Sequence, residues 1–449
     1  MICRRDLLRM IGGSALGGMS VAKADAAAVQ QTPLDGAAAS ATHEVLERYE
    51  RRFAEARLRM PRLDPSIDAD KATIISLAKD CLGIRDEWVP AIRAETVREM
   101  TFDGGRIRLM RATSWPGVTA TALLYLPAGA ADQTFPLVLL CCGHGQGGKL
   151  ADGYQRMARH LTRVGAMVLC PDNVGQGERI AMGHSDCVKP FACGTSVQGL
   201  IVMETLAWLA WARAQPQVDP ARVAAIGNSG GGTLTVFLAA LAPDLAVLSS
   251  SGYPSTFDFI ARKEKKHCHC NILPGVVGRL EMWHLLGAFS PRPLFIFQGD
   301  GDPLFPPDIF HQVARKVRHV YRSRGADEAL EARVINGGHS WDETRNVALG
   351  RFLARHLHLP GKAVSPASEE PLLGENGRCV DPWPADALNT DQLAEQLTGR
   401  SADDGIQLWN VFPPALPNDS RLEDIVPRGS TRQILAQFEA FLGRAKARQ

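Results

Sequence analysis

Neither sign of charge dominates this chain of 449 residues, which carries 50 lysines and arginines against 48 aspartates and glutamates. The formal net charge of +2 provides no basic surface field for nucleic acid, and the chain has no polyanionic tail. Phosphate-binding patterns are lacking as well, because neither P-loop spacing nor G-x-G-x-x-G occurs in the glycine-rich segment around residue 230. A composition that is 45% hydrophobic and 22% charged is that of a globular protein with a large core.

The N-terminal segment has no apolar run long enough for a membrane span, which needs about 20 apolar residues. Its weakly apolar stretch, Met10–Ala22, is too short and rich in glycine. Arg4-Arg5 precede this stretch, and the small residues of Ala24-Asp25-Ala26 follow it. Residues 1–26 resemble a twin-arginine export signal. We therefore expect a periplasmic or secreted protein, exported already folded, with no stable membrane insertion after removal of the signal.

The chain has ten cysteines, and removal of the signal with Cys3 would leave an odd nine. An oxidising compartment permits disulfides. Three cysteines lie in apolar, strand-like runs, where buried inert thiols are expected: Cys141, Cys142 and Cys170. Five others lie in loop-like sequence and could pair, although the sequence does not indicate the pairing: Cys187, Cys193, Cys268, Cys270 and Cys379.

Short, mostly apolar runs alternate with helical patterns in the middle of the chain. The runs are 135–142, 166–172, 223–227, 245–252, 293–300 and 330–337. The helical patterns are 151–164, 196–214, 230–242, 306–324 and 341–359. A strand buried on both faces has no polar face, so this pattern predicts an α/β fold with a mostly parallel central sheet and helices on both faces.

The flanking segments have different patterns. Residues 96–129 read as antiparallel strands with turns at Asp103-Gly104-Gly105 and Pro116-Gly117. Amphipathic helices are expected over 43–60 and 432–447. The sequence shows no internal repeat. We expect four regions, which are the signal (1–26), a linker and N-terminal helical region (27–94), the α/β domain (95–360) and a C-terminal extension (361–449).

Ser229 lies among glycines, in the segment VAAIGNSGGGTLTVFLAAL that spans residues 223–241. It fits G-x-S-x-G between a predicted strand and a predicted helix, which is the context of a nucleophile elbow. Small residues two positions before and after the serine keep the strand and helix from colliding. The elbow would also direct the backbone N–H of Gly230 toward a developing oxyanion.

A serine needs a base, and the base needs an orienting acid. FIFQGDGDPLFPP ends one predicted strand with Asp300 and Asp302, and VINGGHSWD ends the next with His339. The order Ser, Asp, His, each just after a strand, favours a catalytic triad. A second oxyanion donor is expected from the loop LLCCGHGQGGK, with the N–H of Gln146 preferred and that of Gly145 next.

These motifs resemble the α/β-hydrolase superfamily, and more closely its acetyl xylan esterase-like branch. The resemblance covers residues 95–360 through SWPGVTATALLYLPAG, GHGQGGK, PDNVGQGER, GNSGG and SPRPLFIFQGDGDPLFPP. It implies that Asp302 rather than Asp300 is the acid, because similar esterases place the acid a few residues before a proline-containing turn. Two departures stand out: Gly230 replaces a frequent Gln, and Gln146 replaces a frequent aromatic residue.

KEKKHCHCNILPG places four potential zinc ligands together at residues 267–270. Ligands spaced at i and i+2 cannot alone close a tetrahedron, and no second cluster occurs at finger spacing, so no metal is predicted. The segment is interpreted instead as a polar insertion over the active site, in which a cysteine could be tethered to Cys187 or Cys193. In DNVGQGER, Glu178 and Arg179 are expected to pair in a loop bordering the pocket.

The sequence as a whole predicts an exported serine hydrolase that cleaves carboxylic esters through an acyl-enzyme, without a cofactor. Short-chain, acetyl-type esters, including those of carbohydrates, are the expected substrates, because no broad apolar lid is present between Gly252 and Pro293. A prolyl oligopeptidase-like peptidase and a non-catalytic polysaccharide-binding protein are the alternatives. The acyl group, the alcohol, the role of 361–449 and the oligomeric state stay open.

Overall fold

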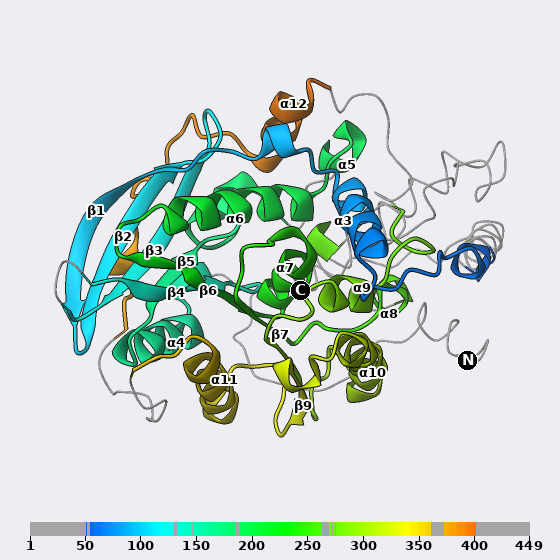
Figure 1. Cartoon of the computed structure of the whole chain (residues 1–449). Coiled ribbons are helices and arrows are strands. Elements are labelled where there is room, and N and C mark those ends of the chain that lie inside the picture. The colour runs from blue at the N-terminus through cyan, green and yellow to red at the C-terminus, as the bar shows by residue number, and fades with distance from the viewer. Residues whose placement is uncertain are drawn as a thin grey trace, which may run out of the picture.

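Nine strands form one sheet in the computed structural model, which describes residues 51, 54–129, 133–145, 147–184, 189–262, 269–271, 273, 275–360 and 372–400 (Figure 1). The strands are β1 (Arg93–Phe102), β2 (Gly105–Thr113), β3 (Thr119–Pro127), β4 (Phe135–Cys141), β5 (Met167–Pro171), β6 (Val218–Asn228), β7 (Val247–Ser251), β8 (Leu294–Gly299) and β9 (Leu330–Ile335). Their order is β1-β2-β3-β5-β4-β6-β7-β8-β9.

The sheet combines two kinds of strand pairing. β1, β2 and β3 are antiparallel, and β3 joins β5 in the same way. From β5 through β4 and on to β9, every pairing is parallel, with Val138 opposite both Val168 and Ala224. Strands β5, β7 and β8 are buried at every residue. The predicted antiparallel lead-in and mostly parallel sheet are confirmed.

Helices cover both faces of this sheet. They are α3 (Asp68–Leu82), α4 (Asp152–Arg163), α5 (Lys189–Cys193), α6 (Val197–Arg213), α7 (Gly230–Leu241), α8 (Phe257–Arg262), α9 (Met282–Gly287), α10 (Pro307–Ser323), α11 (Glu343–His356) and α12 (Thr390–Thr398). The five helical patterns expected between 151 and 359 correspond to α4, α6, α7, α10 and α11. Within the described part of the chain, every helix is too short or too polar to span a membrane.

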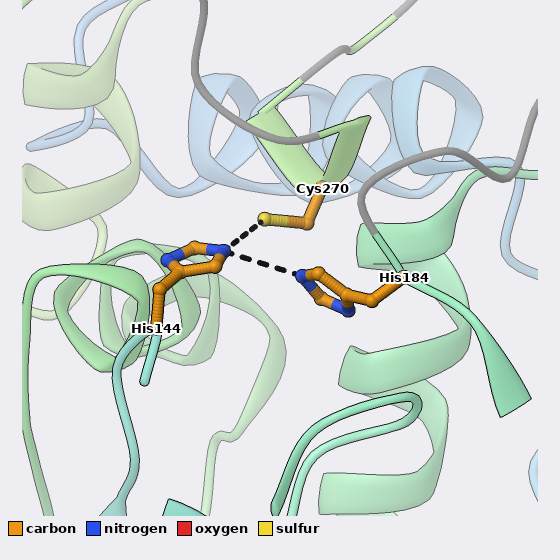
Figure 2. A group of neighbouring side chains, drawn as sticks. All are labelled: His144, His184 and Cys270. Carbon is orange, nitrogen blue, oxygen red and sulfur yellow. Dashed lines mark hydrogen bonds between the residues drawn. The ribbon is translucent and has the colours of Figure 1, made fainter. Parts of the chain in front are cut away.

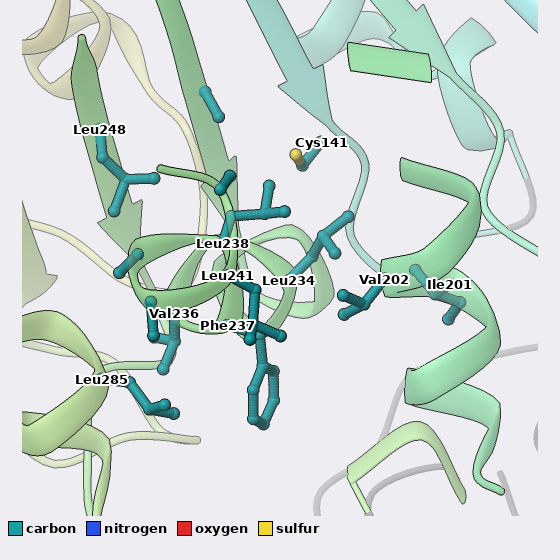
Figure 3. Packing of buried hydrophobic residues seen from close by; sticks show 14 of the residues in the cluster. Cys141, Ile201, Val202, Leu234, Val236, Phe237, Leu238, Leu241, Leu248 and Leu285 are labelled. Carbon is teal, nitrogen blue, oxygen red and sulfur yellow. The ribbon is translucent and has the colours of Figure 1, made fainter. Parts of the chain in front are cut away.

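Alternate side chains of β4 enter two separate cores. Leu137 and Leu139 pack with α3, α6, α7, α9 and α10, whereas Val138 and Leu140 pack with α4 and α11. Figure 3 shows the first core around α7, where Leu234 and Leu238 lie among side chains from the neighbouring strands and helices. Because α7 is buried along most of its length, its N-terminus is held firmly against the end of β6.

The described parts of both flanking regions pack on the α/β domain. Ile74, Ala78 and Leu82 of α3 belong to the first core. The buried side chain of Gln155 hydrogen-bonds both the N–H and the C=O of Leu373, and so fixes the start of residues 372–400. Of the two expected terminal helices, residues 54–58 are helical, and 432–447 lie outside the described residues, as does the expected signal.

Cys141, Cys142 and Cys170 are buried free thiols, as expected. The Sγ atoms of Cys142 and Cys170 lie 3.5 Å apart in a hydrogen bond. Cys81 and Cys379 are also buried free thiols, and Cys193 and Cys270 are buried, so no disulfide joins two of the described cysteines. Of the remaining cysteines, Cys3, Cys187 and Cys268 lie outside the described residues.

Candidate active site

Ser229 occupies a sharp turn between β6 and α7. Its backbone has φ 58° and ψ −120°, a region that side-chain-bearing residues rarely adopt and that costs of order 1–3 kcal/mol. The turn is held by the Ser229 N–H, which donates to the carbonyl of Ser251 at 3.0 Å, and by the Ser229 carbonyl, which accepts from Thr233 N–H at 2.8 Å. The local geometry is therefore that of the expected elbow.

The glycines around Ser229 are required by close backbone contacts. A Cβ atom at Gly227 would lie 2.2 Å from the carbonyl oxygen of Gly231, and one at Gly231 would lie 2.1 Å from that of Cys141. A Cβ atom at Gly230 would lie 2.6 Å from Nδ1 of His144. The ring of His144 thus fills the space that a side chain at position 230 would need, which gives a physical reason for the glycine there.

Asp302 and His339 lie together at the carboxyl ends of β8 and β9, which are parallel neighbours. Oδ2 of Asp302 lies 2.7 Å from Nδ1 of His339. Oδ1 of Asp302 accepts hydrogen bonds from the backbone N–H groups of Leu304 and Phe305, at 2.8 and 3.1 Å. Burial raises the pKa of Asp302, but the bonds from His339 and from these two N–H groups outweigh it, so the pKa lies below its ordinary value.

Asp300 has a different role in the fold. Its side chain is exposed, and Oδ1 accepts a hydrogen bond of 2.8 Å from the backbone N–H of Gly337. This bond ties the turn after β8 to the turn that carries His339. The structure therefore pairs Asp302, and not Asp300, with the imidazole.

Gly252 connects the elbow to the histidine. A Cβ atom at Gly252 would lie 2.6 Å from Oδ1 of Asn228 and 3.1 Å from Cε1 of His339. The ring of His339 thus lies against the chain next to Ser229. Because Nδ1 faces a carboxylate and carries the proton, Nε2 has its lone pair available, and this buried atom has no hydrogen-bond partner among the described residues.

Three supporting side chains were not anticipated from the sequence. Gln298 donates from Nε2 to Oδ2 of Asp302 at 2.5 Å. Trp341 donates from Nε1 to Oγ of Ser251 at 3.0 Å, and Ser251 donates in turn to Oδ1 of Asn228 at 2.8 Å. Gln298 could have been noticed as a polar residue inside an apolar strand, whereas the Trp341–Ser251 contact joins segments 90 residues apart.

The expected oxyanion donors are placed only in part, because Gln146 lies outside the described residues. Gly230 is the first residue of α7, where backbone N–H groups have no partner within the helix and the helix dipole favours negative charge. The backbone nitrogen of His144 would lie 3.2 Å from a Cβ atom at Gly230, and Gly145 faces open space. The loop after β4 therefore runs beside the N-terminus of α7.

Buried ion pairs hold the segments that follow this loop. Nζ of Lys149 lies 2.5 Å from Oδ2 of Asp172 and also pairs with Glu178. Burial lowers the pKa of Lys149, but the two carboxylates and Cys379 outweigh it and raise the pKa above its ordinary value. The expected pairing of Glu178 with Arg179 is wrong, because Arg179 pairs with Glu204 on α6. Glu178 and Arg179 lie in the short 3₁₀ helix η3 (Gly177–Met182), and their side chains leave it in different directions, so each has its own partner.

A possible metal site lies next to the elbow. His144, His184 and Cys270 bring their ligand atoms within 4.8 Å of one another (Figure 2). Only Cys270 belongs to the segment that the sequence singled out for metal ligands. His267 and Cys268 lie outside the described residues, as does the side chain of His269.

Comparisons with known proteins agree with this architecture. No protein-family model matches the chain. It is 25% identical over 203 residues to the Bacillus subtilis protein named "Putative hydrolase YtaP", which covers 44% of this chain and 67% of that protein. Among solved structures it is similar to methylesterase BT1017, with a TM-score of 0.54 and 19% identity over 81% of this chain and 75% of that one.

A second similar structure is that of a protein from Bacteroides fragilis named as a "putative acetyl xylan esterase". Its TM-score is 0.50 and its identity 16%, over 63% of this chain and 80% of that one. At these identities the structural likeness establishes the fold, and the predicted fold is confirmed. The chain has the α/β-hydrolase fold and is similar to proteins named as esterases and hydrolases.

Proposed function

We propose that this chain hydrolyses carboxylic esters through an acyl-enzyme formed on Ser229. The observation that carries the proposal is the Asp302–His339 pair, whose Nε2 has no hydrogen-bond partner among the described residues and whose ring lies against Gly252. Gly252 follows Ser251, whose carbonyl holds the strained turn of Ser229. A strained serine, a base with a free lone pair and a buried carboxylate that orients the base are the parts that nucleophilic ester cleavage needs. The esterase names of the similar structures also support it.

In the first half-reaction, Nε2 of His339 takes the proton of the Ser229 hydroxyl as its Oγ attacks the ester carbonyl carbon. Asp302 stabilises the resulting imidazolium. The N–H groups of Gly230 and Gln146 would bind the tetrahedral oxyanion, helped by the positive end of α7. The intermediate then breaks its bond to the alkoxide, which takes the proton from Nε2 and leaves as the alcohol.

In the second half-reaction, water attacks the acyl group on Ser229 while Nε2 of His339 takes a proton from it. Collapse of the new tetrahedral intermediate returns that proton to Oγ and releases the carboxylic acid. No other group is needed for the atoms and charges to balance.

A fluorophosphonate probe tests the nucleophile. We expect labelling of the wild-type protein at Ser229 alone, located by mass spectrometry of the digested protein, and none of the Ser229→Ala variant. Labelling at another serine, or hydrolysis that persists in Ser229→Ala, would overturn the proposal. The absence of any labelling together with binding of polysaccharide would favour the binding-protein alternative.

The proposed substrates are short-chain, acetyl-type esters, including those of carbohydrates. Each methylene buried in an apolar channel is worth about 0.8 kcal/mol, so an enzyme with such a channel gains specificity as the acyl chain lengthens. The segment between Gly252 and Pro293 is short and contains the polar stretch RKEKKHCHCN. We expect kcat/KM on p-nitrophenyl esters to be highest for acetyl or propionyl and to fall beyond butyryl. A maximum at octanoyl would contradict the small pocket without affecting the nucleophile.

The proposed location is the periplasm or the medium, reached through the twin-arginine signal in residues 1–26. Arg4→Lys combined with Arg5→Lys should retain the precursor in the cytoplasm, as measured by fractionation and immunoblotting. Unchanged secretion of the double variant would show that the arginines are incidental.

A further inference from the structure

Three side chains from three separate segments converge beside Ser229, and we propose that they bind one Zn²⁺ ion. His144 belongs to the loop after β4, His184 to the segment after β5, and Cys270 to η4 (His269–Asn271), which follows β7. Figure 2 shows the three side chains pointing toward one another. Nε2 of His144 lies 3.2 Å from Nε2 of His184 and 3.1 Å from Sγ of Cys270.

The hydrogen bonds around His184 prepare it as a metal ligand. Its Nδ1 lies 2.8 Å from the carbonyl oxygen of Val174, which can only accept, so Nδ1 carries the proton. The lone pair of Nε2 is then directed into the cluster, as happens in metal-binding histidines whose other ring nitrogen donates to a backbone carbonyl. The amide of Gln176 donates to this Nε2 at 3.1 Å, and the ion would replace it there.

Cys270 also has the surroundings of a metal ligand. It is buried, and the Nδ2 amide of Asn271 lies 3.4 Å from its sulfur, where a donor stabilises the thiolate. Binding would convert the thiol to a thiolate and release its proton to solvent. His144 is exposed, which gives an ion a route from solvent to the two buried ligands.

The separations and the ligand types fit zinc. Tetrahedral zinc with ordinary bond lengths places two nitrogens about 3.3 Å apart and a nitrogen and a sulfur about 3.6 Å apart. The nitrogen pair already matches. The sulfur would have to move about half an ångström away from Nε2 of His144 and stay close to Nε2 of His184, since all three ligand atoms already lie within 4.8 Å of one another. Imidazole and thiolate together favour zinc over magnesium or calcium, and three protein ligands leave one tetrahedral position for a further ligand.

The position of the site indicates what the ion would do. The ring of His144 packs on Gly230, and its backbone runs beside the N-terminus of α7. An ion bound by all three side chains would fasten this loop to η4 and to the segment after β5. We therefore assign the ion a positioning role for the oxyanion loop. The zinc site rests on its own ligands, and only its effect on ester turnover rests on the proposed function.

Metal binding by the full-length wild-type protein is the primary test. After removal of metal with a chelator, we expect one Zn²⁺ bound per chain, by elemental analysis and by competition with a chromogenic chelator. Co²⁺ in place of zinc should give a thiolate-to-metal charge-transfer band and the visible absorption of a tetrahedral site. No stoichiometric zinc, or cobalt spectra without a thiolate band, would overturn the assignment. Stoichiometric copper in preference to zinc would overturn it too.

Variants locate the site. Cys270→Ser and His184→Asn should each lower zinc affinity by about 100-fold or more and abolish the rise in melting temperature that zinc gives the wild type. The matched controls Cys81→Ser on α3 and His160→Asn on α4 should retain both properties. Full zinc affinity in the two cluster variants would contradict the proposal. If these variants do not fold, alkylation of the wild type provides the test. Zinc should protect Cys270 from alkylation, and modification of Cys270 in the zinc-loaded protein would contradict the proposal.

The Ser229→Ala variant separates the two proposals. It should bind zinc as tightly as the wild type while lacking esterase activity, so a failed zinc titration and a failed activity assay point to different errors. In wild type, removal of zinc should lower kcat more than it changes KM, because an oxyanion donor acts mainly in the transition state.

Discussion

Oδ2 of Asp302 lies 2.7 Å from Nδ1 of His339, whereas Asp300, two residues earlier, binds the backbone of the turn that carries the histidine. Both carboxylates follow β8, and only the buried one faces the ring. If the proposed triad is correct, the two aspartates must respond differently to the same substitution.

Asp302→Asn should lower kcat/KM for an acetyl ester by about 10⁴-fold, because an amide cannot hold the imidazole in the required tautomer or stabilise its charged form. Asp300→Asn is the matched control and should retain activity within about tenfold, since an amide oxygen can still accept from Gly337. Both proteins should give wild-type circular dichroism. Comparable rates for Asp302→Asn and the wild type would remove Asp302 from the triad.

Ser229→Gly should be inactive and yet more stable than Ser229→Ala. Glycine adopts the φ of 58° without strain, whereas alanine keeps the strained backbone after losing the hydroxyl. Glycine also makes the unfolded chain more flexible, which offsets part of this gain. We therefore expect the free energy of unfolding of Ser229→Gly to exceed that of Ser229→Ala by about 1 kcal/mol. Urea denaturation measures it, and equal stability would mean that the turn stores no strain.

Gly231→Ala should destabilise the protein strongly, because the new Cβ atom would lie 2.1 Å from the carbonyl oxygen of Cys141 and neither backbone can move freely. We expect the free energy of unfolding to fall by about 3 kcal/mol or more, and the activity to be lost. Gly153→Ala on α4 is the control: no atom lies within 4 Å, and alanine should stabilise the helix by about 0.5–1 kcal/mol. Similar melting temperatures for the two variants would refute the close-contact argument.

Glu281 and His284 at the start of α9 should give opposite pH dependences of stability. Burial raises the pKa of Glu281 from 4.5 to about 7. Burial, and then the charge of Lys316, lowers the pKa of His284 from 6.5 to about 4. His284 also accepts the backbone N–H of Glu281 at Nδ1, a bond that protonation there would break.

Between pH 4.5 and 7 folded Glu281 retains a proton that the unfolded chain has released, so its contribution to stability is lost as the pH rises. Between pH 4 and 6.5 the unfolded chain binds the proton of His284, so stability rises with pH. Relative to the wild type, the free energy of unfolding of Glu281→Gln should therefore rise by up to about 3 kcal/mol between pH 4.5 and 7. That of His284→Asn should fall, again relative to the wild type, by a similar amount between pH 4 and 6.5. Urea denaturation across the pH range checks both, and equal slopes in all three proteins would contradict the pKa shifts.

The sequence alone determined the order of strands and helices, because a strand buried on both faces is encoded as an unbroken apolar run. The glycines around Ser229 likewise encode the sharp turn between β6 and α7. The sequence also placed Asp302 and His339 at successive strand ends, where parallel pairing of β8 and β9 brings them together. Their catalytic role stays a prediction.

Only the tertiary structure decided the contacts between segments far apart in the chain. Arg179 pairs with Glu204 rather than Glu178, and Gln155 anchors Leu373, 218 residues away. His184 and Cys270 meet His144 because the order of the sheet carries the ends of β4, β5 and β7 to one edge. Local periodicity encodes which face of an element is buried, but not which distant loop will lie beside it, so the candidate zinc site could not be predicted from ligand spacing.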